Sequence, residues 1–346
     1  MASSDLNLDV VLSQLGYGVD GRIHIIEPIV SGQSGGRVFR LHTSSRNTNT
    51  LILKLLEPDR IPDYLRQDYP HIVEAEWRFY TELGPRLATP LPNIYEAGRL
   101  PNGCSFLLME DLAKEHLIPS SDHSWTNDEL LAVLSTYAML HGRSARLFAN
   151  QSVPNWLHGD DRERFSPVTV LACLQSFYDN AWTQASVEPI VRSPALGVLL
   201  ERVTTGLTAI EPAVLFNDFY PPNVALPLDG GPAKLFDWQL VGNGPRHLDI
   251  VNIGFLSRQD GFARVDRAML LDFYLKRYTD ESGEHIDAGL FMHEYSLAKL
   301  LAWGVFMPRM VRIMQKASQR GERFSPWMER TFDNCTADWM EELRLI

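Results

Sequence analysis

The chain is poor in cysteine and in long apolar runs, and each shortage excludes a class of protein. Its 346 residues contain only Cys104, Cys173 and Cys335, with no CxxC spacing, so neither a disulfide framework nor a zinc site is indicated. No uncharged apolar run approaches the roughly 18 residues that a bilayer span requires. The N-terminus shows no basic segment followed by an apolar core, so no secretory signal is indicated. We therefore expect a protein of the reducing cytoplasm with no membrane partner.

Basic residues are also in short supply. Lys and Arg number 32 against 43 Asp and Glu, which gives a formal net charge of −11. Such a chain is a poor candidate for binding nucleic-acid phosphates or anionic lipid. The apolar share of 45% and the charged share of 22% are typical of a soluble globular protein and exclude wholesale disorder. At about 150 residues per domain, the length predicts two domains or lobes.

The first part of the chain is β-rich. Residues 22–56 contain strand-like runs, and the turn SGQSGG between two of them predicts a tight hairpin. Apolar residues at helical spacing predict a helix over 71–84 that stops at Gly84-Pro85. A second strand pair is predicted at 93–98 and 105–109.

The later part of the chain is mostly helical. Helical patterns dominate from Trp125 onward, apart from a strand-like island at 213–238. The sequence therefore predicts an α+β chain with a small antiparallel-sheet lobe over 1–112 and a larger, mostly helical lobe over 113–346.

Two charged residues occupy apolar surroundings. Lys54 lies inside Leu51-Ile52-Leu53-Lys54-Leu55-Leu56, and Glu76 lies on the apolar face of the predicted helix, among Ile72, Phe79 and Tyr80. Because burying an isolated charge is costly, an acid and a base in such places are natural partners. The alternative is an edge strand on which Lys54 reaches solvent, with Glu76 at the helix margin.

A predicted hairpin brings two oxygen ligands together. Residues 224–226 and 233–236 read as short strands joined by a turn, and folding about Gly230 places Asn223 beside Asp237. Two oxygen donors at the open end of a hairpin suit magnesium (Mg2+), which also takes substrate phosphates as ligands. Asp218, five residues upstream of Asn223, is a candidate general base. The alternative is that these Asn, Asp and Pro residues are ordinary loop residues that favour turns and bind no ligand.

Together these motifs resemble the protein-kinase-like fold of the aminoglycoside phosphotransferase and choline kinase family, in motif order over residues 24–255. The resemblance implies Asp218 in FNDFYPPN as catalytic base, with Asn223 and Asp237 (in FDWQ) as metal ligands. It further implies that Asp249 in GPRHLDI braces the catalytic loop, and that Met139-Leu140-His141-Gly142 belongs to a core helix. Nucleotide binding is implied for residues of the glycine turn, the lysine and its helix partner, and the hinge LLMEDL: Ser34, Gly35, Gly36, Lys54, Glu76, Glu110 and Leu112.

The chain departs from the family pattern in two places. Phe216 stands where the catalytic loop usually carries His, and Gln239 stands where many relatives have Glu. A second stretch, His158-Gly159-Asp160, imitates the catalytic loop, but Phe165 replaces the required Asn and no acid-bearing hairpin follows. We predict that it is a polar surface loop or a loop of the substrate-binding lobe.

The resemblance implies an ATP- or GTP-dependent phosphotransferase acting on a hydroxyl of a small molecule. One alternative, supported by Phe216, is a kinase-fold nucleotide-binding or regulatory protein with little catalysis. A protein kinase is disfavoured because Gly244-Pro245 follows Asp237 too closely for a long phosphorylatable loop.

The acceptor is left open by the sequence. One possibility is an acidic pocket formed by Asp160, Asp161 and Glu163 for an aminoglycoside or an amino alcohol. The other is an aromatic wall for a quaternary ammonium group, formed by Trp156, Trp182 and Trp303.

Overall fold

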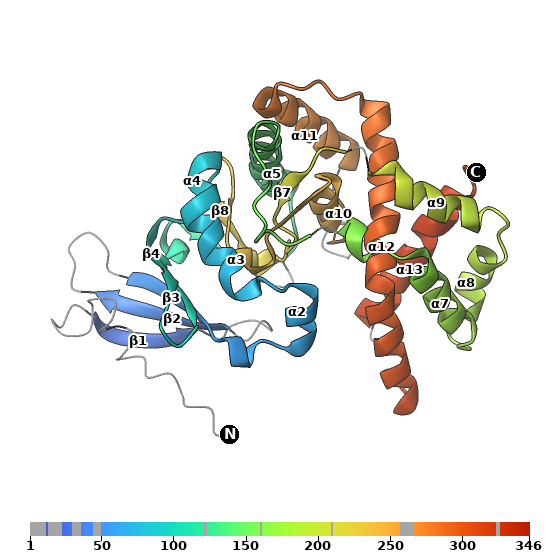
Figure 1. Ribbon diagram of the computed structural model, residues 1–346, viewed down its shortest axis with the longest axis horizontal. Helices are drawn as coiled ribbons and strands as arrows, with labels where there is room; N and C mark the ends of the chain where they lie inside the picture. Colours follow the sequence, from blue (N-terminus) through green and yellow to red (C-terminus); the bar gives the residue numbers. More distant parts are fainter. Residues whose placement is uncertain are drawn as a thin grey trace.

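The computed structural model describes residue 12 and residues 23–29, 36–43, 50–120, 123–159, 161–208, 210–256, 266–322 and 326–346. Its elements run along one long axis, with the N-terminal sheet at one end and helices α7, α8, α9 and α13 at the other (Figure 1). None of the helices in these ranges is long and apolar enough to span a membrane.

An antiparallel sheet of five strands forms the N-terminal lobe, in the order β1-β2-β3-β5-β4. Its strands are β1 (Ile23–Ile29), β2 (Gly36–Thr43), β3 (Thr50–Leu56), β4 (Ile94–Arg99) and β5 (Ser105–Glu110). Central strand β3 is buried from Leu51 to Leu56, as an apolar run covered on both faces should be. The predicted strands are confirmed, although the turn that joins β1 to β2 lies outside the described residues.

Helical structure between β3 and β4 carries Glu76. It comprises η1 (Pro58–Arg60), α2 (Asp63–Asp68), α3 (Ile72–Arg78), the π-helical turn η2 (Phe79–Leu83) and α4 (Gly84–Leu87). The predicted stop at Gly84-Pro85 is wrong, because α4 continues through both residues to Leu87. Pro85 lies in the first turn of α4, where its missing N–H costs nothing. A Cβ at Gly84 would lie 2.6 Å from Leu91 Cδ1, so a larger residue there would require the Leu91 side chain to shift.

The C-terminal lobe is mostly helical. Its helices are α5 (Asn127–Phe148), α6 (Asp161–Arg164), α7 (Pro167–Tyr178), α8 (Gln184–Val191), α9 (Leu196–Gly206), α10 (His247–Leu256), α11 (Arg267–Ser282), α12 (Ala288–Gln319) and α13 (Pro326–Leu343). The short strands are β6 (His116–Leu117), β7 (Ala213–Leu215), β8 (Val224–Pro227), β9 (Lys234–Leu235) and β10 (Gly242–Gly244), with 3-10 turns η3 (Leu112–Lys114), η4 (Pro221–Asn223) and η5 (Trp238–Leu240).

The predicted order of a small antiparallel-sheet lobe and a larger helical lobe is confirmed. The division into 1–112 and 113–346 stays a prediction; β5 ends at Glu110, two residues before it.

Helix α5 supports the strands that lead into the site. Its N-terminus is fixed by a capping box, in which Glu129 N donates to Thr126 Oγ1 and Thr126 N donates to Glu129 Oε2. Buried polar residues of the helix then bond to neighbouring segments: Val214 N in β7 donates to Ser144 Oγ at 2.9 Å, and Thr136 Oγ1 donates to the carbonyl of Ala233, which directly precedes β9. One apolar core therefore contains residues of α3, α5, β7 and the β8–β9 hairpin.

Candidate active site

Lys54 lies at the centre of the candidate site, between two carboxylates. Its side chain projects from β3 and the residue is 7% exposed. The ammonium Nζ lies 2.7 Å from Glu76 Oε2 and 2.6 Å from Asp237 Oδ1. Burial lowers the pKa of Lys54, but the two carboxylates outweigh that effect and the net shift is upward. The predicted pairing of Lys54 with Glu76 is therefore present, and Asp237 joins it.

Glu76 connects α3 to the segment around Asp237. Its Oε2 binds Lys54, while its Oε1 accepts the backbone N–H of Trp238 at 3.1 Å. Burial raises the pKa of Glu76 and the Lys54 ammonium opposes that rise. The carboxylate thus holds both the lysine and the start of η5.

The β8–β9 hairpin brings Asn223 and Asp237 to its open end, with a register that differs from the prediction by one residue. Val224 pairs with Leu235, and Phe236 N donates to the carbonyl of Asn223 at 3.1 Å. Asn223 therefore lies opposite Phe236, not opposite Asp237. The centre of the hairpin falls between Asp229 and Gly230, so folding about Gly230 itself was wrong.

Asp218 lies in the loop after β7 and is half-buried. Its Oδ2 accepts a hydrogen bond from Asn223 Nδ2 at 2.9 Å. Burial raises the pKa of Asp218 to about 7 and the nearby Asp237 carboxylate adds to the rise, whereas the Lys54 ammonium and the Asn223 amide oppose it. A carboxyl with a pKa near 7 is suited to accept a proton at neutral pH.

Asp249 holds the Asp218 loop through its backbone. It accepts the N–H of Phe216 at 2.7 Å and the N–H of Asn217 at 2.8 Å, and it is fully buried. His141 Nε2 lies 3.1 Å from the same carboxylate, and its Nδ1 lies 2.9 Å from the Tyr274 hydroxyl. A carboxylate only accepts, so His141 donates from Nε2 and Tyr274 donates to Nδ1. These contacts are those of the bracing role that the resemblance implied.

Asn217, which the sequence analysis did not single out, joins the Asp218 loop to η5. Its φ of 60° and the φ of 66° at Asp237 both lie in the left-handed region, which costs a non-glycine residue about 1–3 kcal/mol. Asn217 Nδ2 donates to the carbonyl of Leu240 at 3.0 Å. A Cβ at Gly242 would lie 2.7 Å from that nitrogen, so glycine is required for this approach. An Asn directly before the candidate base is the sequence signal, because Asn tolerates this conformation.

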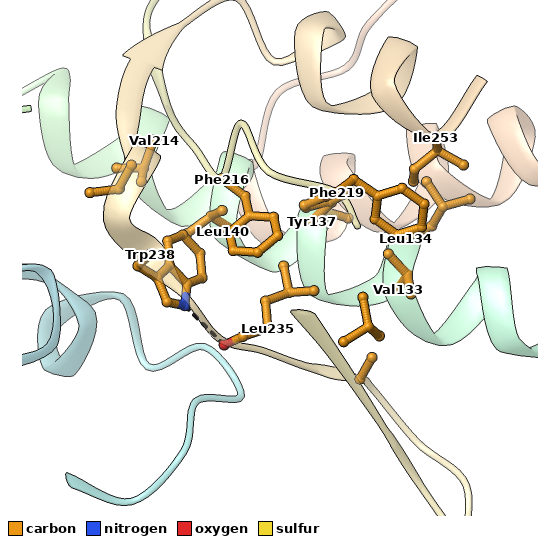
Figure 2. Packing of buried hydrophobic residues seen from close by; sticks show 14 of the residues in the cluster. Val133, Leu134, Tyr137, Leu140, Val214, Phe216, Phe219, Leu235, Trp238 and Ile253 are labelled. Atoms are coloured by element: carbon orange, nitrogen blue, oxygen red, sulfur yellow. Dashed lines mark hydrogen bonds between the residues drawn. The ribbon is translucent and has the colours of Figure 1, made fainter. Parts of the chain in front are cut away.

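Phe216 and Trp238 pack against each other in the core, next to the segments that carry Asp218 and Asp237. Phe216 is fully buried, and its ring lies 4.8 Å from that of Trp238 at 66°. Figure 2 shows both rings in the cluster that includes Tyr137 and Leu140 of α5. Position 216 therefore contributes packing, while the bracing of the loop comes from its backbone N–H.

The predicted hinge residues Glu110 and Leu112 lie at the end of β5 and at the start of η3. Glu110 accepts from Asn93 N at 3.1 Å and from Asn93 Nδ2 at 2.8 Å, and it pairs with Lys234 of β9. Lys234, the charged residue of Ala233-Lys234-Leu235, was not among the predicted residues. Leu112 is buried at the start of η3.

Of the predicted glycine turn, only Gly36 is described. It begins β2 and pairs with Leu56 of β3. Ser34 and Gly35 lie outside the described residues.

His158, the first residue of the stretch that imitates the catalytic loop, is buried. His158 is 2% exposed, its Nε2 lies 3.2 Å from the Gln239 carbonyl, and it forms an isolated bridge with Gly242. Its loop is thus paired with β10, and the prediction of a polar surface is wrong for His158. Asp160 lies outside the described residues.

The prediction that three tryptophans form one aromatic wall is also wrong. Trp156 and Trp303 are buried in two separate core clusters, where they donate to Glu82 and Asp338 respectively. Trp182 alone of the three is exposed. The side chains of Asp161 and Glu163 lie outside the described residues, so the acidic pocket stays a prediction.

Comparisons with known proteins identify the family. The sequence profile of the family described as "Phosphotransferase enzyme family" matches residues 25–286. No curated protein sequence matches the chain.

Solved structures of similar fold include small-molecule kinases. Choline kinase LicA from Streptococcus pneumoniae has a TM-score of 0.55 at 12% identity, covering 96% of this chain and 99% of that one. The GDP and kanamycin complex of APH(2″)-IIIa has a TM-score of 0.58 at 10% identity, covering 96% and 97%. Plasmodium vivax ethanolamine kinase has a TM-score of 0.55 at 11% identity, covering 98% and 88%. These neighbours confirm the predicted protein-kinase-like two-lobe fold. The profile match over residues 25–286 shows that the chain belongs to the phosphotransferase enzyme family.

Proposed function

We propose that this chain is a small-molecule kinase that moves the γ-phosphate of ATP or GTP to a hydroxyl group, with Asp218 as the catalytic base. The observation that carries the proposal is the arrangement of Lys54 between Glu76 and Asp237, together with Asp218 bonded to Asn223. Phosphoryl transfer needs alignment and charge neutralisation more than covalent help from the protein, and this arrangement can supply both.

Lys54 would orient the nucleotide. Its ammonium would bind the α- and β-phosphates while Glu76 retains it from the helix side. Backbone N–H groups of Ser34, Gly35 and Gly36 would cover the terminal phosphates. The backbone of the hinge segment from Glu110 to Leu112 would hold the base of the nucleotide.

Asn223 and Asp237 suit magnesium. Both offer hard oxygen donors, and the Asp237 side chain is 30% exposed, whereas those of Lys54 and Glu76 are below 10%. Asn223 uses its Nδ2 on Asp218, which leaves its amide oxygen for a ligand. Among the described residues, no group of three or more His, Cys, Asp or Glu side chains could hold a metal. These two residues would therefore hold Mg2+ jointly with the nucleotide phosphates, whose charge it would offset.

Asp218 would accept a hydrogen bond from the acceptor hydroxyl and take its proton as the phosphoryl group transfers. Its raised pKa places it close to neutral pH, where a base can both exist ionised and accept a proton. The acceptors we propose to test first are those in the names of the fold neighbours: choline, ethanolamine and kanamycin.

A binding protein without catalysis is the second candidate, because Phe216 replaces the usual His. Retention of Lys54, Asp218, Asn223 and Asp237 argues against it, as does the hydrogen bond from Phe216 N to Asp249.

The test is magnesium-dependent release of ADP or GDP over a panel of aminoglycosides, amino alcohols, sugars and hydroxylated amino acids. Asp218→Asn is the matched control, because it keeps the shape of the side chain and removes the base. We expect acceptor-stimulated release that falls about 100-fold or more in the variant, with nucleotide affinity retained. Nucleotide binding without stimulation by any acceptor would favour the second candidate.

A further inference from the structure

The loop that carries Asp218 also presents an aromatic ring. Tyr220, two residues after Asp218, is 46% exposed, whereas Phe219 between them is 7% exposed. Phe219 packs into the core, with its ring 5.4 Å from Trp125 and 6.4 Å from Tyr137. Tyr220 has extended backbone, at φ −127° and ψ 134°. Phe219 therefore faces the core, whereas the Tyr220 side chain is exposed two residues after the half-buried Asp218.

Neighbouring contacts hold Tyr220 in place. Its carbonyl accepts the backbone N–H of Asn223 at 2.8 Å, and Asn223 in turn bonds Asp218. Pro221 and Pro222 follow, and each ring fixes the backbone φ of its residue. The core contacts of Phe219 anchor the other side. Tyr220 therefore projects from a loop whose backbone is held on both sides, and its Cα lies at most about 7 Å from that of Asp218, the reach of two residues of extended chain.

We propose that Tyr220 is a specificity-determining residue of the acceptor site, and that its ring packs against the carbon skeleton of the acceptor while a hydroxyl of that acceptor reaches Asp218. The inference rests on the proposed function. An exposed aromatic face offers a large apolar contact and attracts a cationic substituent, and less freedom is lost on binding when the backbone that carries the ring is already held. The contact selects acceptors whose skeleton extends beyond the reacting carbon, and it is made by the ring face, not by the phenol hydroxyl.

The test compares Tyr220→Ala and Tyr220→Phe with the wild type, using the panel acceptor that gives the highest kcat/KM. We expect Tyr220→Ala to raise the KM for that acceptor about tenfold, which corresponds to about 1.4 kcal/mol, with the KM for nucleotide within twofold of wild type. Tyr220→Phe should keep the wild-type KM for the acceptor, because it keeps the ring. Tyr95→Ala is the matched control, since Tyr95 is 48% exposed on β4 and should change neither KM.

The possible outcomes separate the two claims. An unchanged acceptor KM in Tyr220→Ala, or an equal rise in the KM for acceptor and nucleotide, overturns the role of Tyr220 and leaves the proposed function standing. A loss in Tyr220→Phe as large as that in Tyr220→Ala overturns the ring contact. If no acceptor stimulates the wild type, the proposed function fails and the inference fails with it.

Discussion

The ring of Phe216 packs against the ring of Trp238, 4.8 Å away, and Trp238 stacks on Phe79 at 3.9 Å. An aromatic column therefore runs from the helical turn after α3, through the residue that follows Asp237, to the loop that carries Asp218. On its other side, Phe216 lies 6.4 Å from Tyr137 of α5 (Figure 2). Through these ring contacts, apolar packing joins the segments that carry Glu76, Asp237 and Asp218.

Restoring the histidine that relatives carry should harm this chain. Phe216→His would bury an imidazole among apolar rings, so we expect a loss of about 2 kcal/mol in the free energy of unfolding and no gain in kcat. Urea denaturation and acceptor-stimulated ADP release measure the two effects. Phe216→Leu, which stays apolar but loses the ring, controls for packing. A Phe216→His protein of wild-type stability with a higher kcat would show that position 216 is not a packing position.

Removal of Lys54 should cost more stability than removal of the charge on Glu76. Lys54→Met leaves Glu76 and Asp237 facing each other without a cation, and an uncompensated buried charge costs about 3–5 kcal/mol. Glu76→Gln leaves Lys54 paired with Asp237 and keeps an oxygen for the N–H of Trp238. We therefore expect the free energy of unfolding to fall by only about 1–2 kcal/mol. Chemical denaturation of both variants at pH 7.5 measures the difference. Equal losses would mean that Asp237 does not compensate Lys54.

Asp237→Ala should remove the dependence of nucleotide binding on magnesium. In the wild type we expect nucleotide to bind more weakly when magnesium is chelated, because Asp237 and Asn223 would share the ion with the phosphates. Calorimetric titration with and without magnesium measures the effect, with Asp218→Asn as the control that keeps it. If nucleotide binding by Asp237→Ala still depends on magnesium, Asp237 is not a ligand.

The residues of the candidate site were predictable because their signals are local. Lys54 interrupts a run that is apolar on both sides, and Glu76 breaks the apolar face of a helix, so a single window shows that each needs a partner. The identity of that partner also follows, because each is the natural counter-charge of the other. Asp237 as a second partner of Lys54 could not be read locally, because it depends on how the hairpin meets the sheet.

What the sequence did not predict depends on backbone conformation or on distant contacts. The hairpin register follows from a turn in which Gly230 and Gly231 adopt φ values of 84° and 109°. The helical structure continues past Pro85 because this proline lies in the first turn of α4, directly after the π-helical turn. His158 is buried because its loop pairs with Gly242, far along the chain. Local residue patterns report none of these three features.

Acid should destabilise the protein through two buried imidazoles. Burial lowers the pKa of His158 and of His247 to about 4 each, against an ordinary value of 6.5. The hydrogen bond to the Gln239 carbonyl opposes this shift at His158, and Glu294 opposes it at His247, but burial outweighs both. A folded-state pKa below the unfolded one means that the unfolded chain binds more protons between these values. The stability that each neutral imidazole contributes is therefore complete above pH 6.5 and is lost as the pH falls toward 4.

A variant with a side chain that does not titrate, compared with the wild type, isolates the contribution of each imidazole to the pH dependence of stability. The raised pKa of Asp218 acts in the opposite direction, because its folded form binds a proton that the unfolded form releases, so the wild-type profile alone mixes the two. When the pH falls from 7.5 to 5, the free energy of unfolding of His158→Gln should rise relative to that of the wild type by on the order of 2 kcal/mol, since Gln has no proton to take up. His247→Gln should show the same trend, because the pKa of His247 is lowered equally. Urea denaturation at both pH values gives the difference, and a stability gap to wild type that stays constant between them would mean that these imidazoles are protonated in the folded protein.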